Sequence, residues 1–435
     1  MKERADHKSW MKLDNAAKIY PAAKRRDWTA LFRFSAELDE EVDPRLLAAA
    51  QARALKRLPG FAQRLKRGFF WYYLEHNEGA PDIQEDVANP CVRLAPRENK
   101  GFLFRVRYYR CRVSLEVYHV LADGSGGVSF FKTMLAEYLR LRYGADIPRD
   151  DEILDCDEAP RPDELEDAYL KYARRLGRSR REPNAYYLRG TPDSDDFIHI
   201  TTGMLPVKEA LAKAKEKQVT LSEYIVSAMI MALDNIQRSS GLPERLLKPV
   251  KICVPVDLRR FYPTHTKRNF SLFVNPGIEP KYGSYTFDEV LASVHHQMGA
   301  EVTEKALNAR IATNVRSEQQ PVLRVMPLFV KNLAMRYMFN RVGDRKTSTC
   351  ISNLGAQRLP DAMASHISRM DLVLGPLSRN RVVCGMISYN GMLTLNFTRT
   401  IRESVLEREF FRFLVKQGLH VKIEANYRPE EEEEA

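Results

Sequence analysis

The chain has 435 residues, which is more than one hydrophobic core usually holds, so we expect two domains. Hydrophobic residues make up 44% of the chain and charged residues 29%, which is typical of a soluble globular protein, and no stretch approaches the roughly 20 apolar residues of a transmembrane helix. The net charge of +11 fits a surface that attracts phosphates or acidic carrier proteins, and equally an ordinary solvated surface.

The N-terminal sequence and the cysteines indicate the cellular compartment. The start, "MKERADHKSWMKLDN", is charged and lacks the apolar segment of a secretion signal. The six cysteines are scattered without a C-x-x-C pair, which argues against a zinc site and against a disulfide framework. We therefore expect a cytoplasmic protein with reduced cysteines.

Residues 1–144 are expected to form an N-terminal lobe that mixes strands and helices. Alternating apolar residues or dense aromatic and β-branched residues predict strands over residues 27–38, 67–75 and 101–120. A helix is predicted after Asp43 as N-cap, with Pro44 in its first turn, and it stops at Pro59. A second helix follows the glycines near residue 125 and ends at Gly144.

Residues 145–196 differ in composition from the segments on either side. They are rich in proline and in charge, first acidic and then basic, and they keep tyrosines and leucines. We interpret them as a charged crossover between two lobes, with one short helix over 164–176.

Residues 197–429 are expected to form a C-terminal lobe. Strands are predicted over 197–205, 248–261, 268–278, 347–356, 369–377, 382–400 and 419–427, and helices over 207–218, 220–241, 287–316, 321–341 and 403–417. The like-charge tail, residues 430–435, should be disordered. Each lobe mixes strands with helices, so the fold class is α/β or α+β, with a mixed sheet flanked by helices in each of two domains.

The stretch "VYHVLADGSGG", residues 117–127, is the strongest candidate for a reaction centre. A strand leads to His119, and Gly124, Gly126 and Gly127 permit a sharp turn after it. His119 is either an inert residue at a strand end or a general base whose tautomer is fixed by local backbone contacts. Asp123 either orients His119 directly or braces the loop by pairing with an arginine. No third metal ligand stands nearby in sequence, so no metal is expected.

With its strand before and amphipathic helix after, this stretch resembles the H-x-x-x-D-G signature of the chloramphenicol acetyltransferase-like superfamily. That superfamily includes CoA-dependent acyltransferases, wax ester synthases, alcohol acetyltransferases and the condensation domains of nonribosomal peptide synthesis. "VPVDLRRF" (residues 254–261), "NFSLFVNP" (residues 269–276) and "TCISNLG" (residues 349–355) are similar to later segments of the same superfamily. The resemblance thus covers both halves of the chain.

The resemblance implies two similar domains that enclose a tunnel with the catalytic histidine near its middle. His119 would then be the general base, within the catalytic motif that Asp123 and Gly124 complete. Asp123 would pair with Arg259, or failing that with Arg260, to hold the loop. Ser352 and Asn353 would either line the substrate tunnel or cap a strand end at a turn.

The resemblance also implies the substrates. The donor would be an acyl-CoA or the thioester of an acyl-carrier protein, the acceptor a small alcohol or amine, and no cofactor would be bound permanently. The basic cluster around Lys171 and Arg174 either reaches the phosphates of such a donor or is solvated. No nucleic-acid-binding module is found, so no nucleic-acid partner is expected.

Departures from the family patterns narrow the subfamily. Tyr118 stands where condensation domains have a second histidine, and "MDLVLGPL" (residues 370–377) stands in the place of the D-F-G-W-G motif of plant acyltransferases. These departures favour a stand-alone enzyme similar to bacterial alcohol acetyltransferases. The alternatives are a condensation-like enzyme that forms amides from carrier-bound substrates, and a catalytically silent relative that binds a partner.

Overall fold

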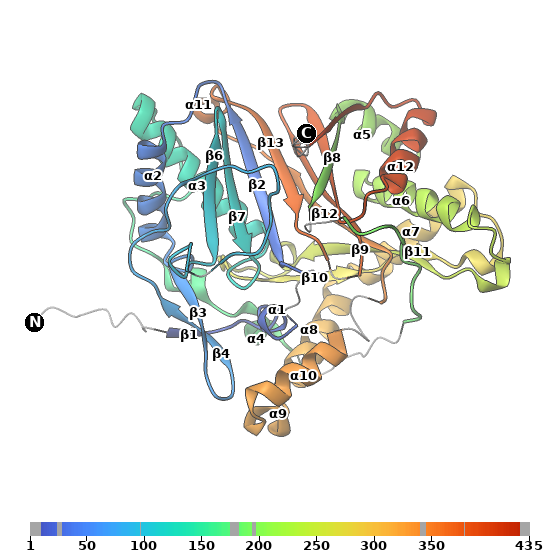
Figure 1. The fold of residues 1–435 in the computed structure, drawn as a ribbon, viewed down its shortest axis with the longest axis horizontal. Coiled ribbons are helices and arrows are strands. Elements are labelled where there is room, and N and C mark those ends of the chain that lie inside the picture. The colour runs from blue at the N-terminus through green and yellow to red at the C-terminus, as the bar shows by residue number, and fades with distance from the viewer. Residues whose placement is uncertain are drawn as a thin grey trace, which may run out of the picture.

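The computed structural model describes residues 10–23, 28–95, 97–174, 182–193, 197–339, 345–377 and 379–426. These residues form a mixed α/β architecture in which two large sheets lie next to each other and carry helices on their outer sides (Figure 1). The α/β class expected from the sequence is confirmed. The acidic tail, residues 430–435, lies outside the described residues.

The first large sheet has the strand order β13-β2-β7-β6-β5. Its strands are β2 (Leu31–Leu38), β5 (Gln84–Glu85), β6 (Phe104–Tyr109), β7 (Arg112–Tyr118) and β13 (Ile367–Leu374). Helices α2 (Pro44–Arg57) and α3 (Gly124–Tyr143) cover one face of this sheet (Figure 1). Phe34, Leu115 and Phe131 are among the buried residues that form the core between the sheet and these helices.

The predicted ends of both helices are correct. The Asp43 carboxylate accepts hydrogen bonds from the backbone N–H groups of Arg45 and Leu46, which caps α2. Helix α3 ends at Gly144, whose positive φ of 66° is a conformation that glycine adopts without strain.

The second large sheet has the order β10-β9-β12-β14-β15-β8-β16, with β11 paired to β9. Its strands are β8 (His199–Pro206), β9 (Val250–Asp257), β10 (Ser271–Val274), β11 (Gly277–Ile278), β12 (Thr349–Ala356), β14 (Val382–Tyr389), β15 (Met392–Arg399) and β16 (Lys422–Ala425). Asn390 and Gly391 both have positive φ and join β14 to β15, as their sequence predicts. The helices that belong to this half are α5 (Val207–Glu216), α6 (Leu221–Arg238), α7 (Phe287–Glu301) and α12 (Val405–Lys416).

Strand β13 crosses from one half of the chain to the other. It lies within the segment 197–429 that was expected to form the C-terminal lobe, yet it pairs antiparallel with β2 of the first sheet. Gly385 of β14 approaches β13 so closely that a Cβ there would lie 2.3 Å from the carbonyl oxygen of Leu372. The two large sheets therefore meet at β13.

A third region projects from the lower side of the molecule in Figure 1. It contains a small sheet of β1 (Trp10–Lys12), β3 (Gln63–Arg67) and β4 (Tyr72–His76), together with helices α1 (Ile19–Ala22), α8 (Glu304–Gln319), α9 (Pro321–Val325) and α10 (Leu328–Met338). The expected helices 287–316 and 321–341 are wrong as continuous elements, because each is broken in two. Thr303 caps a new helix by accepting from the N–H of Ala306, and Pro327 separates α9 from α10.

The crossover contains less regular structure than expected. The single helix predicted over 164–176 is replaced by a 3-10 turn at Pro162–Leu165 and the short helix α4 (Ala168–Tyr172). Asp167 lies between the 3-10 turn and α4. Its carboxylate accepts a hydrogen bond from the N–H of Tyr169 and so caps the start of α4. The short helix α11 (Asp361–Ala364) and 3-10 turns at Glu244–Leu246, Leu258–Arg260 and Pro280–Tyr282 complete the described elements.

No helix in the described part of the chain is by itself long and apolar enough to cross a bilayer. Helices α5 and α6 meet the length and composition requirement only when taken together, and they are bent by 84°.

Candidate functional site

His119 is the first residue after strand β7. Its backbone N–H donates to the carbonyl oxygen of Ala30 at 3.0 Å, which extends the pairing of β7 with β2 by one residue. Its ring lies against two aromatic rings, stacked on Tyr20 with the centroids 5.0 Å apart and tilted against Phe32 at 4.6 Å. The imidazole is thus positioned by the sheet and by two aromatic side chains.

The turn after His119 is packed too tightly for side chains. A Cβ on Gly124 would lie 2.8 Å from a methyl carbon of Leu354, and a Cβ on Gly126 would lie 2.0 Å from the carbonyl oxygen of Lys267. Gly126 is therefore required, because the backbone around residue 267 approaches the start of α3, whereas the contact at Gly124 is with the end of a leucine side chain that can rotate aside.

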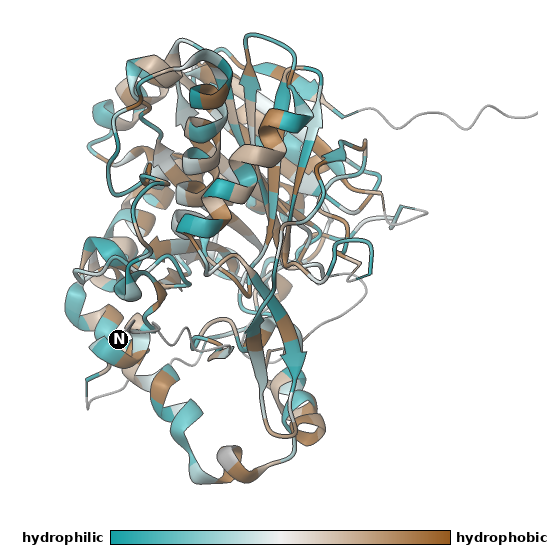
Figure 2. Cartoon of the chain, turned by 90° about the vertical axis from the view of Figure 1, so that its left-hand side faces the viewer, coloured by the Kyte–Doolittle hydropathy of each residue, from teal (hydrophilic) through white to brown (hydrophobic). Residues whose placement is uncertain are grey.

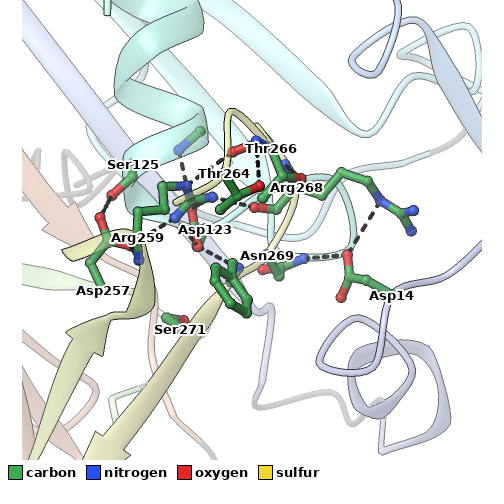
Figure 3. Close-up of polar contacts among 12 residues, drawn as sticks. Asp14, Asp123, Ser125, Asp257, Arg259, Thr264, Thr266, Arg268, Asn269 and Ser271 are labelled. Atoms are coloured by element: carbon green, nitrogen blue, oxygen red, sulfur yellow. Dashed lines mark hydrogen bonds and ion pairs between the residues drawn. The ribbon is translucent and has the colours of Figure 1, made fainter. Parts of the chain in front are cut away.

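Asp123 directs its carboxylate toward Arg259 (Figure 3). Arg259 Nη1 donates to Asp123 Oδ2 at 2.9 Å, and Arg259 Nη2 donates to Asp123 Oδ1 at 3.2 Å. The same carboxylate accepts from the backbone N–H of Gly126 at 3.1 Å and of Phe270 at 2.7 Å. Of the two roles considered for Asp123, these contacts match the bracing of the loop.

Arg259 uses its remaining donors to hold the neighbouring loop. Its Nη1 also donates to Asp257 at 3.0 Å, and its guanidinium donates to the carbonyl oxygens of Thr266 and Arg268. Burial disfavours the charge, but Asp123 and Asp257 more than compensate and raise the pKa of Arg259. Arg260, the second candidate, is exposed.

A second contact links the two halves at this point. Ser125 Oγ, in the first turn of α3, donates to Asp257 Oδ2 at 2.7 Å (Figure 3). Together with the Asp123–Arg259 pair, this bond connects the start of α3 to the end of β9.

Asn269 is a site residue to which the sequence interpretation gave no role. Its side-chain amide donates to the backbone carbonyl of His119 at 2.9 Å and to Asp14 at 3.2 Å (Figure 3). The residue lies within "NFSLFVNP", and the resemblance of that segment to the superfamily is the available sequence signal. Tyr20 had no such signal, because it contacts the ring from a segment about 100 residues away.

The surroundings of His119 keep its imidazole neutral. Burial lowers the pKa of His119 below its usual value of 6.5, and the nearby Asp123 charge opposes this only in part. The Nδ1 atom is buried and has no hydrogen-bond partner among the described residues. A neutral imidazole is able to accept a proton at neutral pH.

His119 lines a large cavity between the two large sheets. The cavity has a volume of about 1240 Å³, and residues of β2, β9, β12 and β13 contribute to its wall. Apolar side chains such as Leu31, Leu372 and Leu374 line it, together with basic residues, among them Lys171 and Lys267, and about as many acidic ones. The cavity can therefore accommodate a ligand that has both an apolar and a polar portion.

Gly124, Ser352 and Asn353 also line this cavity. Asn353 uses its side chain locally: its amide donates to Ser222 at 2.8 Å, and its oxygen accepts from the N–H of Gly355 at 2.7 Å. It therefore lines the cavity, and its second bond stabilises the irregular part of β12 between Asn353 and Ala356 instead of capping a strand end.

No group of three His, Cys, Asp or Glu side chains arranged for a metal ion is found in the part of the chain that the structure describes. None of the six cysteines, all of which lie within the described ranges, forms a disulfide, and two of them, Cys253 and Cys350, are register partners on β9 and β12 in the wall of the cavity.

No protein-family model matches the chain, and no curated protein matches its sequence. Its fold, however, is similar to solved structures along almost its whole length. The first condensation domain of the calcium-dependent antibiotic synthetase has a TM-score of 0.61 at 14% identity, over 94% of this chain and 96% of that chain. The polyketide synthase associated protein 5 from Mycobacterium tuberculosis has a TM-score of 0.59 at 15% identity, over 93% and 96% of the two chains.

Trichothecene 15-O-acetyltransferase from Fusarium sporotrichioides is also similar, with a TM-score of 0.56 at 12% identity over 95% of this chain and 96% of that chain. The chain therefore has the fold of the chloramphenicol acetyltransferase-like and condensation-domain superfamily, as the sequence resemblance implied.

Proposed function

We propose that this protein is an acyltransferase that moves an acyl group from an acyl-CoA, or from an acyl-carrier thioester, to a hydroxyl or amine acceptor. The observation that carries the proposal is the neutral imidazole of His119 in the wall of a cavity formed by both sheets. The fold supports it, because an acetyltransferase and condensation domains share that fold.

In this mechanism His119 acts as the general base. Because Nδ1 is buried, we assign the proton-accepting role to Nε2. Nε2 removes the proton of the acceptor as its oxygen or nitrogen attacks the thioester carbonyl carbon. The C–S bond then breaks, the imidazolium returns the proton to the leaving thiolate, and the products are the acylated acceptor and a free thiol.

Asp123 and Arg259 have a positioning role in this scheme. Their ion pair fixes the turn between His119 and α3 relative to β9, and so keeps the imidazole aligned with both substrates. Gly124 allows the turn to lie against Leu354 in the cavity wall.

An acyl-CoA donor is supported by two observations. The starter condensation domain of rhizomide synthetase, solved in complex with C8-CoA and Leu-SNAC, has the same fold at a TM-score of 0.58 and 15% identity, over 94% of this chain and 93% of that chain. The cavity here has apolar walls that suit an acyl chain, and among its mixed basic and acidic lining residues Lys171, Arg260 and Lys267 are the candidates for contacting phosphates.

The direct test is to incubate the protein with acyl-CoA donors and a panel of alcohols and amines, and to identify acylated products by mass spectrometry. His119→Ala should lower kcat by about 100- to 10,000-fold, because a positioned general base contributes that much. His119→Gln, which keeps most of the side-chain volume, guards against a loss of folding. His296→Ala on α7 is the matched control, because this histidine is exposed, and it should retain full activity.

Three outcomes contradict the proposal in different ways. Full activity in both His119 variants removes His119 from the mechanism. Products that form only with aminoacyl carrier thioesters indicate the condensation-like alternative. The absence of product with every donor and acceptor indicates a binding protein that keeps the fold without turnover.

A further inference from the structure

We propose that the tip formed by α9, α10 and the β3–β4 turn docks on an anionic lipid bilayer. This tip, defined as residues 68–71 and 321–338, belongs to the region that projects below the two large sheets in Figure 1. Hydrophobic positions, drawn brown, occur on the elements that project at the lower end of Figure 2.

Helix α10 presents an apolar stripe to solvent. Phe329, Leu333 and Tyr337 recur every four residues, and their exposed fractions are 67%, 70% and 59%. Because residues four apart lie on the same side of a helix, these side chains form one face. Such a face on an otherwise well-packed protein is expected to contact another apolar phase.

The turn between β3 and β4 extends this apolar face. Phe69 is 72% exposed and contacts the partly exposed ring of Phe70 at a centroid distance of 4.8 Å. The backbone of the turn is bonded to α10, since Leu328 N–H donates to Phe69 O at 2.9 Å and Lys331 Nζ donates to Phe70 O at 2.8 Å. The turn and α10 therefore present their apolar side chains as one unit.

Further apolar side chains surround this unit. Val322 and Val325 of α9 are exposed, and Trp10 of β1 is half exposed and packs edge-on against Tyr73. Tryptophan and tyrosine are the side chains that favour the boundary between headgroups and acyl chains.

The charges around the tip select an anionic surface. The segments 10–12, 63–73 and 321–338 contain seven lysines and arginines and not one aspartate or glutamate; Lys331 is buried and Arg64 and Lys66 contact Glu75, which leaves four of the seven outside these contacts. The first acid beyond the turn, Glu75, is paired with Arg64 at 2.6 Å. An apolar protrusion with a basic surround is complementary to a bilayer that contains anionic lipids.

The opposite side of α10 faces the cavity that contains His119. Lys331, Met335 and Met338 belong to the cavity wall, as do Leu323 and Trp71 of the neighbouring elements. An apolar molecule that leaves the bilayer at the tip would therefore enter next to the wall of the cavity that contains His119. This route for a lipid-dissolved substrate rests on the proposed function, whereas binding of the bilayer does not.

The test is flotation of the full chain with vesicles of phosphatidylcholine alone or mixed with phosphatidylglycerol. We expect binding to the mixed vesicles and a marked loss of binding when salt is raised. The triple variant Phe69→Ser, Phe329→Ser, Leu333→Ser should bind the mixed vesicles with an affinity lowered about tenfold or more, because the three substitutions remove the apolar anchors. All three side chains are exposed, so its melting temperature should stay close to that of the unchanged protein.

The matched control replaces exposed apolar residues elsewhere: Leu242→Ser, Tyr282→Ser, Val415→Ser. It should bind vesicles as well as the unchanged protein. The proposal is overturned if the unchanged protein does not float with mixed vesicles, or if the tip variant floats equally well. Binding of an acidic carrier protein through the tip, without binding of vesicles, also overturns it. His119→Ala should still float, so failure of acyl transfer and failure of docking are distinguishable.

Discussion

The position of His119 is determined by contacts that come from three separate parts of the chain. Ala30, Phe32 and Tyr20 hold it from the N-terminal side, and Asn269 bonds its carbonyl from 150 residues away. The local motif identified the histidine and the aspartate, whereas Arg259, with Arg260 as its alternative, was predicted from the superfamily resemblance. The aromatic and amide contacts could not be predicted, since they exist only after the sheet has formed.

The environment of His119 predicts the acid side of the pH profile. Because burial lowers its pKa below 6.5, the imidazole should remain neutral as the pH falls through that value. We expect kcat/KM of acyl transfer to stay constant down to pH 6.5 and to fall in more acidic solution, with a slope near one decade per pH unit. The measurement is kcat/KM between about pH 4.5 and pH 8. A midpoint above pH 6.5 would show that this histidine titrates as if exposed or paired with a carboxylate.

At the scale of elements, the sequence predicted those helices that carry their own end signals. Asp43 caps α2 and Gly144 ends α3 as expected, and of the two capping residues that the sequence offers for α6, Thr220 and Ser222, the structure uses Thr220. The long tracts around residues 302 and 327 were predicted as unbroken because their apolar spacing continues across the break. The actual ends of these helices depend on where α8 and α10 pack in the folded protein. The spacing of apolar residues along the chain does not give this information.

The start of α3 depends on a glycine that a neighbouring segment makes necessary. Gly126→Ala would place a methyl group 2.0 Å from the carbonyl oxygen of Lys267. We expect this substitution to lower the free energy of unfolding by about 1–3 kcal/mol and to reduce activity, because the turn after His119 must shift. Gly299→Ala in α7 is the control. It has no atom within 4 Å of the added Cβ, and it should be neutral or stabilising by up to about 1 kcal/mol. Denaturant titration measures both, and equal effects would contradict this account.

At the scale of the whole molecule, the two halves share secondary structure as well as a cavity. The sequence predicted two lobes that each mix strands and helices, and it resembled the superfamily. It did not predict that β13 would join the first sheet. A strand's residues specify its preference for a sheet, whereas the choice of neighbouring strand depends on the rest of the fold. The Asp123–Arg259 and Ser125–Asp257 contacts connect the same two halves.

These connections predict a single unfolding event. Loss of the second half would expose β2 and leave Asp123 without its arginine, so neither half should remain folded alone. Calorimetry of the full chain should show one transition with equal calorimetric and van't Hoff enthalpies. Two resolved transitions would mean that the halves are energetically independent despite β13.

The pairing of β2 with β13 also has a consequence for biosynthesis. The two strands are separated by roughly 330 residues, and a ribosome adds about 5–20 residues per second, so the free edge of β2 waits roughly 20 to 70 s for its partner. Throughout that interval an unpaired strand edge is available to other nascent chains. The protein is therefore expected to rely on chaperones that bind early in translation.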